Sequence, residues 1–127
     1  MDVWANPSCS KSRAAVAALT AAGIGHTTRR YLDDPPTTGE LDDVLTALGL
    51  QPWDIARLGE PAAHELGLAA LTKDPHAPAD RARWIEVLAA HPILIQRPIL
   101  IAADGSAHLG RDAAGIAAAI AHEQTGG

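Results

Sequence analysis

Apolar residues near the start of the chain follow two spacings, which predict a strand, a helix and a second strand. A short apolar run indicates a strand at residues 3–5, and a stretch rich in β-branched and aromatic residues indicates another at 26–32. Between them, residues 10–22 have helical periodicity, with Val16 and Leu19 on one apolar face. The first thirty residues therefore predict a β-α-β unit.

The next segments are predicted to be helical. Thr37 and Glu40 have the spacing of a capping box, and Leu and Val then recur with a helical period up to Gly49. From about residue 52 to 90, Gly and Pro interrupt the apolar positions, so several short helices are expected rather than one long element. The last of these helices is predicted at 78–90.

The final third predicts a hairpin followed by a helix. Residues 91–101 are strongly apolar, but Pro98 has no N–H group for a sheet ladder and should lie at a strand start or bulge. The Asp-Gly pair at 104–105 is typical of a hairpin turn, with a return strand at 107–109. A closing helix is predicted at 112–122.

The order of these elements favours one fold class. A β-α-β-α run, a helical insert at about 52–90 and a final β-β-α run are typical of an α/β thioredoxin-like fold. We expect a four-stranded mixed sheet flanked by helices, in a single domain spanning residues 1–127. In this fold the functional site lies where the first strand ends and the first helix begins. An X-Pro bond before the third strand faces that site and is usually cis, which makes the Arg97–Pro98 bond the candidate cis bond.

Composition narrows the possible classes of protein. The 127 residues suit one domain, and a net charge of −5 argues against a nucleic-acid binder. No apolar run is long enough for a membrane span, and the acidic, Pro-broken start does not resemble a signal peptide, so a cytoplasmic protein is expected. With one Cys and six scattered His, neither an internal disulfide nor a metal site is expected. Phe is absent, so the core should consist of Leu, Ile, Val and three Trp.

The only cysteine, Cys9, is the first candidate for chemistry. It lies between the predicted strand at 3–5, an Asn6-Pro7 turn and the helix that begins at Ser10. Unpaired N–H groups at a helix start favour a thiolate and can hold an anion. A helix terminus supplies only about 0.3–1 kcal/mol, so nearby cations must contribute to an activated thiol. A buried structural cysteine is the alternative interpretation.

Three arginines stand out by their context. Arg57 precedes a Leu-Gly-Glu-Pro run, Arg97 interrupts an apolar segment, and Arg111 follows Gly110 at the junction between the last strand and helix. A guanidinium can bind a tetrahedral oxyanion through two N–H groups, which favours a functional role for Arg97. Surface pairing with the 15 acidic residues is the alternative.

Several of these stretches together resemble one family. The chain is similar to the glutaredoxin-coupled arsenate reductases (ArsC/Spx-like), a thioredoxin-fold branch that also contains the Spx regulators. The matching stretches are N-P-S-C-S-K-S-R at 6–13, Y-L-D-D-P-P at 31–36, L-G-L at 48–50, R-L-G-E-P at 57–61, E-L-G-L at 65–68, H-P-I-L-I-Q-R-P-I at 91–99 and L-G-R at 109–111. The first and the sixth of these stretches are specific in combination.

The resemblance implies an oxidoreductase that reduces arsenate to arsenite. It implies that Cys9 is the nucleophile, that Arg57, Arg97 and Arg111 hold the oxyanion and that Pro98 is cis. It also implies no bound cofactor, an external low-molecular-weight thiol such as glutathione as co-substrate, a glutaredoxin-like redox partner and a monomer. Backbone N–H groups of Ser10 and Ser12 are further candidate ligands for the anion.

The chain departs from the family pattern at two positions. Some relatives have a histidine directly before the Asn-Pro pair, and this chain has Ala5 there. His26 or His91 could replace that histidine in space, or each could be a structural residue. Ser12 stands where disulfide-switch relatives have a second cysteine, which disfavours a redox switch of the Spx type.

Two alternative functions stay open. The first keeps the fold and the thiol but changes the substrate of the thiol-dependent reductase. The second is a non-catalytic regulatory binding protein of the Spx kind, which would not need all three arginines.

Overall fold

The computed structural model describes residues 1–6 and 8–126, with only the backbone of residues 125 and 126. The Pro7 half of the predicted Asn-Pro turn therefore lies outside the described residues. The chain divides into two compact units. A sheet unit contains Met1–Asp34 and Arg97–Gly127, and a helical unit contains Pro35–Gln96.

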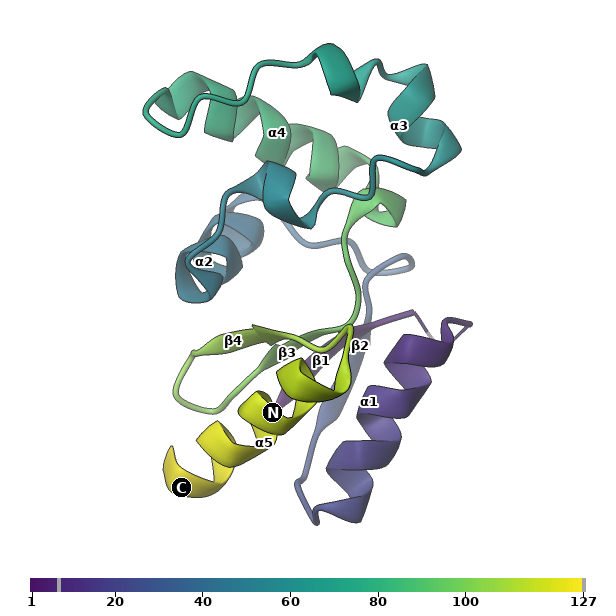
Figure 1. Ribbon diagram of the computed structural model, residues 1–127, viewed down its shortest axis with the longest axis vertical. Coiled ribbons are helices and arrows are strands. Elements are labelled where there is room, and N and C mark those ends of the chain that lie inside the picture. The colour runs from purple at the N-terminus through teal and green to yellow at the C-terminus, as the bar shows by residue number, and fades with distance from the viewer. Residues whose placement is uncertain (7, 127) are drawn as a thin grey trace. The chain divides into compact units, whose positions relative to one another are not determined.

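The sheet unit contains the predicted mixed four-stranded sheet (Figure 1). Its strands are β1 (Asp2–Ala5), β2 (Thr27–Arg30), β3 (Ile99–Ile101) and β4 (Ala107–Leu109), in the spatial order β2-β1-β3-β4. β1 is parallel to β2, and β3 is antiparallel to both β1 and β4. The expected thioredoxin-like arrangement of strands is confirmed.

Two helices lie on the same side of this sheet, α1 (Ser10–Ala21) and α5 (Ala113–Gly126) (Figure 1). Because side chains alternate along a strand, β1 directs Val3 and Ala5 to the same face. These two side chains pack with a small hydrophobic core whose other buried members are Ala15, Leu19, Leu100 and Ala119. Small side chains allow both helices to approach the sheet closely.

Two predicted boundaries in this unit were wrong. β2 has four residues rather than seven, because β1 offers only four partners, from Asp2 opposite Thr27 to Ala5 opposite Arg30. α5 continues to Gly126, well past His122, because neither Pro nor Gly occurs between Gly115 and Gly126 to end an alanine-rich helix.

The register of the sheet brings four chain segments to one edge. β1 and β2 are parallel, so both end at the edge where Ala5 lies opposite Arg30. β3 begins there, with Ile99 opposite Trp4, and β4 ends there, with Leu109 opposite Ile99. We call this the α1 edge, because α1 also begins there (Figure 1).

The helical unit confirms the prediction of several short helices. Its elements are α2 (Thr38–Leu48), η1 (Pro52–Ile55), α3 (Pro61–Glu65), η2 (Leu68–Ala70), α4 (Pro78–Ala90) and η3 (Pro92–Leu94). The capping box at the start of α2 is formed in both directions between Thr37 and Glu40. Trp84 is buried, donates through Nε1 to the Thr72 carbonyl at 2.9 Å and meets Trp53 edge to face at 6.3 Å.

The tryptophans differ in their burial. Trp4 and Trp84 belong to the buried core, whereas Trp53 is half-buried. None of the described helices is both long and apolar enough to cross a bilayer.

Candidate active site around Cys9

Cys9 is the N-cap residue of α1, at the α1 edge. Its backbone is extended (φ −93°, ψ 129°), its carbonyl accepts the first helical hydrogen bond from Arg13 N at 3.1 Å, and its side chain makes no capping bond. The thiol is half-buried and unpaired with any other sulfur. An extended N-cap keeps the side chain near the open N–H groups of the first helical turn.

Asn6 holds the loop that presents Cys9. Its carbonyl accepts from Cys9 N at 2.9 Å, its Oδ1 accepts from Ser8 N at 3.0 Å, and its own N–H donates to Ser12 Oγ at 3.1 Å. Ser12 is only 1% exposed, so this last bond anchors the loop to buried structure in α1. Asn6 is therefore a positioning residue that the sequence reasoning did not select.

The surroundings of Cys9 favour its thiolate. Partial burial acts to raise the pKa of the thiol, but a hydrogen bond and the positive charge of Arg97 oppose this, together with backbone N–H groups of Ser12 and Lys11. The combined effect lowers the pKa of Cys9 to about 7. At pH 7 a thiol with this pKa is about half ionised, against about 3% for an ordinary cysteine with a pKa of ~8.5.

Two nitrogens of the Arg97 guanidinium group have no hydrogen-bond partner among the described residues. The side chain is half-buried, and its Nε and Nη1 atoms are buried with no hydrogen-bond partner among the described residues. Buried guanidinium N–H groups without acceptors are costly, so an arrangement of this kind is typical of a site that receives an anion. Arg97 leads into β3 through a cis peptide bond to Pro98.

Tyr31 is a second residue that the sequence reasoning did not select. It follows β2 at the α1 edge and is fully buried. Partial burial acts to lower the pKa of the Arg97 guanidinium, but the Cys9 and Tyr31 side chains oppose this and raise that pKa. Tyr31 is the only tyrosine in the chain, and it lies in the Y-L-D-D-P-P stretch, which was the one available signal.

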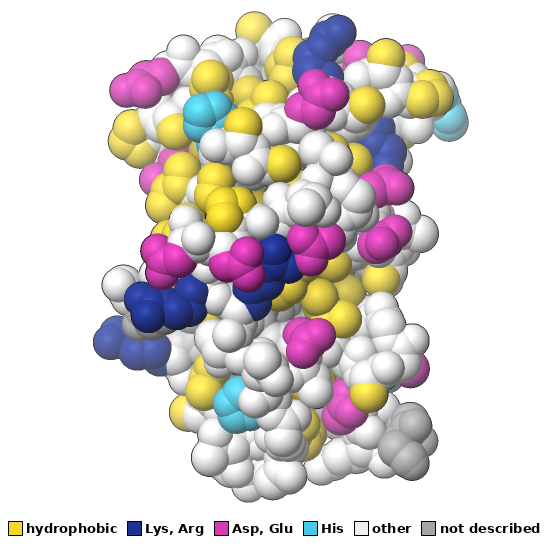
Figure 2. All heavy atoms as spheres, turned by 180° about the vertical axis from the view of Figure 1, so that it is seen from behind, with side chains coloured by type: hydrophobic (Ala, Val, Ile, Leu, Met, Phe, Trp, Pro, Cys, Tyr) yellow, Lys and Arg dark blue, Asp and Glu magenta, His cyan; other side chains and the backbone are white. Residues whose placement is uncertain are grey.

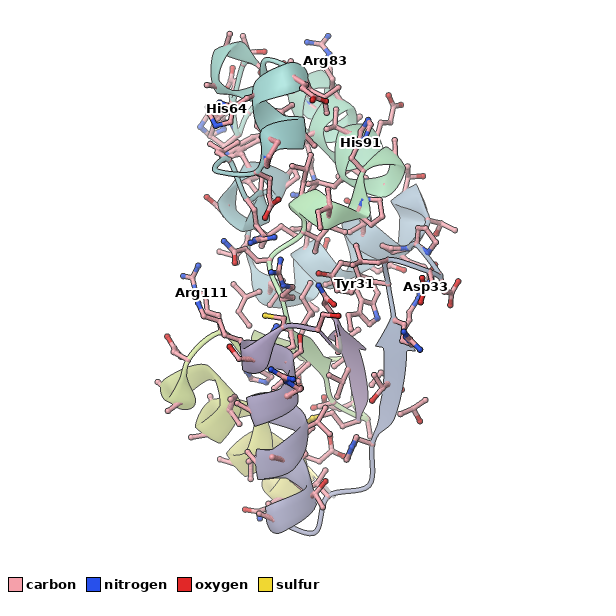
Figure 3. All side chains as sticks on the ribbon, turned by 90° about the vertical axis from the view of Figure 1, so that its right-hand side faces the viewer. Tyr31, Asp33, His64, Arg83, His91 and Arg111 are labelled. Atoms are coloured by element: carbon pink, nitrogen blue, oxygen red, sulfur yellow. The ribbon has the colours of Figure 1, made fainter. Side chains whose placement is uncertain are left out.

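Arg111 also lies at the α1 edge, directly after β4. Its side chain is exposed, and Figure 3 shows it at the same end of the sheet unit as Tyr31. The preceding Gly110 packs against the cis proline, because a Cβ at Gly110 would lie 3.0 Å from Pro98 Cγ, and Gly110 N donates to the Pro98 carbonyl at 2.9 Å. The segments that carry Arg97 and Arg111 are thus fixed to each other.

The two serines of the first turn differ in their surroundings. Ser10 is exposed at the start of α1, whereas Ser12 is buried and accepts the hydrogen bond from Asn6. The Ser12 side chain therefore has a structural partner, and its backbone N–H group is the part that faces the Cys9 thiol.

Arg57 belongs to the helical unit. Its Nη1 pairs with Glu60 and donates to the Ile93 carbonyl at 3.3 Å, and its backbone N–H donates to the Leu94 carbonyl at 2.7 Å. From the sequence, the alternative to a functional role is that each arginine pairs with an acidic residue at the surface. Arg57 forms such a pair with Glu60.

His26 does not take the place of the histidine that the family resemblance leads us to expect before Asn6. Ala5 is buried and has no group that can accept a proton. His26 precedes β2, whose first residue pairs with Asp2, so it lies at the opposite edge of the sheet from Cys9. Its Nδ1 contacts the Ile24 carbonyl at 3.1 Å, as a structural histidine would. His91 belongs to the helical unit.

The residues described in the structure include no cluster of three or more His, Cys, Asp or Glu side chains that could hold a metal ion. The chemistry available at the α1 edge is that of an activated thiol beside unpaired guanidinium donors.

Comparisons with known proteins show the family to which the chain belongs. The chain is 51% identical over 111 residues to an uncharacterized protein in the glnII region of Streptomyces viridochromogenes, covering 87% of this chain and 91% of that one. It is 37% identical over 121 residues to an arsenate reductase of Neisseria meningitidis, covering 94% and 97%. A solved arsenate reductase from Vibrio cholerae superposes with a TM-score of 0.73 at 35% identity, covering 87% and 91%. The ArsC family pattern matches residues 4–119, and the chain therefore belongs to the ArsC family.

Proposed function

We propose that this protein is an arsenate reductase in which Cys9 is the nucleophile. The observation that carries the proposal is the pair formed by Cys9, with a pKa of about 7, and Arg97, whose Nε and Nη1 lack partners among the described residues. A thiolate beside unused guanidinium donors suits a tetrahedral oxyanion. The arsenate reductases among the relatives support arsenate as that oxyanion.

In the first step the Cys9 thiolate attacks arsenic(V). An arsenic–sulfur bond forms, and one As–OH group takes up a proton and leaves as water. Arg97 holds the oxyanion and stabilises the negative charge on its oxygens as the bond forms. The backbone N–H groups of Ser10 and Ser12 would add donors on the side of the helix start.

The remaining steps need thiols from outside the chain, because Cys9 is the only cysteine. A low-molecular-weight thiol such as glutathione replaces a second arsenic hydroxyl, which leaves as water. A glutaredoxin-type thiolate then attacks the sulfur of that bound thiol, a mixed disulfide forms, and the electron pair of the broken S–As bond reduces arsenic(V) to arsenic(III). Hydrolysis of the Cys9–arsenic(III) bond releases arsenite and restores the thiol. No bound cofactor is needed.

We propose that Arg57 and Arg111 complete the oxyanion site. Arg111 is exposed at the α1 edge, the same edge at which α1 presents Cys9. For Arg57 the proposal requires that the guanidinium be shared between Glu60 and the substrate. Each arginine should contribute transition-state stabilisation that Gln cannot replace, because Gln is uncharged and cannot form a charge-assisted pair of bonds.

The test is arsenate-dependent NADPH oxidation in the presence of glutathione, glutaredoxin and glutathione reductase. Cys9→Ser should abolish turnover, and Gln at Arg57, Arg97 or Arg111 should each lower kcat/KM for arsenate by about tenfold or more. The exposed Arg83→Gln in the helical unit is the charge-matched control and should turn over normally. Arsenate reduction retained by Cys9→Ser would refute the proposal.

A thiol-dependent reductase acting on another substrate is the second candidate. It is favoured by Ala5, which provides no proton acceptor next to the loop that carries Cys9. In that case the coupled assay would show no arsenate turnover, although Cys9 would still titrate near pH 7.

A further inference from the structure

A groove between α1 and the neighbouring strands shares Ser12 with the proposed oxyanion site but contains none of its arginines. It has a volume of about 350 Å³ and is lined by Ala5, Ser12, Arg13, Val16, Ala17 and Thr28. All six residues belong to the sheet unit. The space exists because alanines at positions 5 and 17 leave room between the helix and the strands.

The groove starts one helical turn from the reactive thiol. Arg13 is four residues after Cys9 and donates its backbone N–H group to the Cys9 carbonyl at 3.1 Å, so both residues lie on one face of α1. With a rise of about 1.5 Å per residue, Arg13 lies roughly 6 Å farther along the helix axis. Val16 and Ala17 extend the same face by another turn. A molecule lying in the groove can therefore bring one end to Cys9.

The lining has the chemistry of a site for a small anionic molecule. Its volume is at the lower end of the range for small-molecule sites, and its surface is mainly aliphatic. Arg13 is exposed and forms no ion pair within the described part of the chain. Thr28 contributes a hydroxyl from β2, on the face that α1 covers.

Two other arginines of the sheet unit already have acidic partners. Arg29 pairs with Asp34 and Arg30 pairs with Asp33, each at 3.3 Å. Figure 2 shows that several Lys and Arg side chains lie beside Asp and Glu side chains on one face. Arg13 is thus the cation in the groove that a ligand carboxylate can meet.

We propose that this groove binds the low-molecular-weight thiol that resolves the Cys9 adduct, with a carboxylate of that thiol on Arg13. The inference rests on the proposed function, because it assigns a place to the co-substrate of that reaction. Arg97 does not line the groove, so a thiol bound there leaves the Arg97 guanidinium available to the oxyanion. A thiol without a carboxylate would lose the contact with Arg13.

Thiol–disulfide exchange tests this site without arsenate. The Cys9 thiolate is mixed with oxidised glutathione, which carries carboxylates, or with the neutral 2-hydroxyethyl disulfide. In each reaction the thiolate attacks one sulfur, a Cys9 mixed disulfide forms, and the other half leaves as a thiolate. The rates are measured by intact-protein mass spectrometry and divided by the thiolate fraction of each variant, and the neutral disulfide controls for any change in the nucleophilicity of the thiolate.

Arg13→Gln should slow the reaction with oxidised glutathione by about 3- to 10-fold and change the neutral reaction by less than about twofold. Ala17→Leu, which fills the groove, should also slow the glutathione reaction by about threefold or more. The controls are Arg83→Gln for the loss of charge and Ala14→Leu, an exposed α1 position outside the groove, for the added bulk; both should behave as the wild type.

Two results would overturn the proposal. The first is an equal effect of Arg13→Gln on both disulfides, and the second is an unchanged glutathione rate in both groove variants. Because the exchange reactions contain no arsenate, either of these results leaves the arsenate reductase proposal intact. Conversely, if the wild type shows the expected exchange rates but no arsenate turnover, the reductase proposal alone is refuted.

Discussion

Replacing Arg97 by Gln should raise the pKa of Cys9 and change how its reactivity depends on pH. Arg97 provides both a hydrogen bond and a positive charge to the thiolate, while the N–H groups of Lys11 and Ser12 contribute from the helix start. Gln keeps a polar side chain of similar reach but removes the charge. The effect of partial burial, which raises the pKa of Cys9, would then be offset only by the remaining hydrogen bonds and not by a positive charge at position 97.

The size of the effect follows from two opposing factors. If the pKa rises from about 7 to an ordinary ~8.5, the thiolate fraction at pH 7 falls from about 50% to about 3%. A thiolate with the higher pKa is intrinsically more nucleophilic, by about 5-fold for a Brønsted coefficient of ~0.5. The variant should therefore react about 3-fold more slowly at pH 7 and about 5-fold faster above pH ~9.5, with the two rate curves crossing near pH ~7.8.

Thiolate absorbance near 240 nm and iodoacetamide alkylation measure these two quantities directly, because the chain has a single cysteine. Both are followed from about pH 5 to pH 10, with Arg83→Gln as a control that also loses one positive charge at an exposed site. If Arg97→Gln keeps a Cys9 pKa near 7 and its rate curve does not cross that of the wild type, the assignment of Arg97 as the group that stabilises the thiolate is wrong.

Two substitutions test the scaffold behind the site. Gly115→Ala should destabilise the protein by about 3 kcal/mol in urea denaturation, because a Cβ there would lie 1.9 Å from the Leu109 carbonyl oxygen and push α5 off the sheet. Gly25→Ala, where a Cβ meets nothing within 4 Å, should have little effect, and equal losses for the two would contradict the packing argument. Ser12→Ala should cost about 1–3 kcal/mol because the Asn6 N–H group loses its acceptor, and a stability equal to the wild type would show that this bond does not hold the loop.

Much of the fold could be predicted because local signals and long-range constraints agree. The capping box at Thr37 and the proline at the start of α4 mark helix starts that are purely local, and α4 spans the predicted 78–90. The ends of β2 and α5 were wrong for different reasons. The length of β2 depends on how many partners β1 offers, which a single segment cannot reveal. The end of α5 lacks any stop signal before Gly126.

Residues of the candidate site could be predicted only where the residue type and its sequence context together indicate a chemical role. A lone cysteine before a helix and an arginine within an apolar run are both visible in the sequence, and the structure brings Cys9 and Arg97 together at the α1 edge. Tyr31 and Asn6 were not selected, because a buried hydroxyl and a loop of backbone hydrogen bonds have no sequence signature of their own. That Arg97 Nε and Nη1 lack partners among the described residues is likewise visible only in three dimensions.

The central claim is that an oxyanion binds beside the Cys9 thiolate through Arg97, and protection of Cys9 from alkylation tests it most directly. Iodoacetamide labelling at pH 7 is measured with increasing arsenate at constant ionic strength, in the wild type and in Arg97→Gln. We predict saturable protection by arsenate in the wild type, none by chloride, and loss of protection in the variant. A wild-type alkylation rate that stays the same at every arsenate concentration would contradict the account.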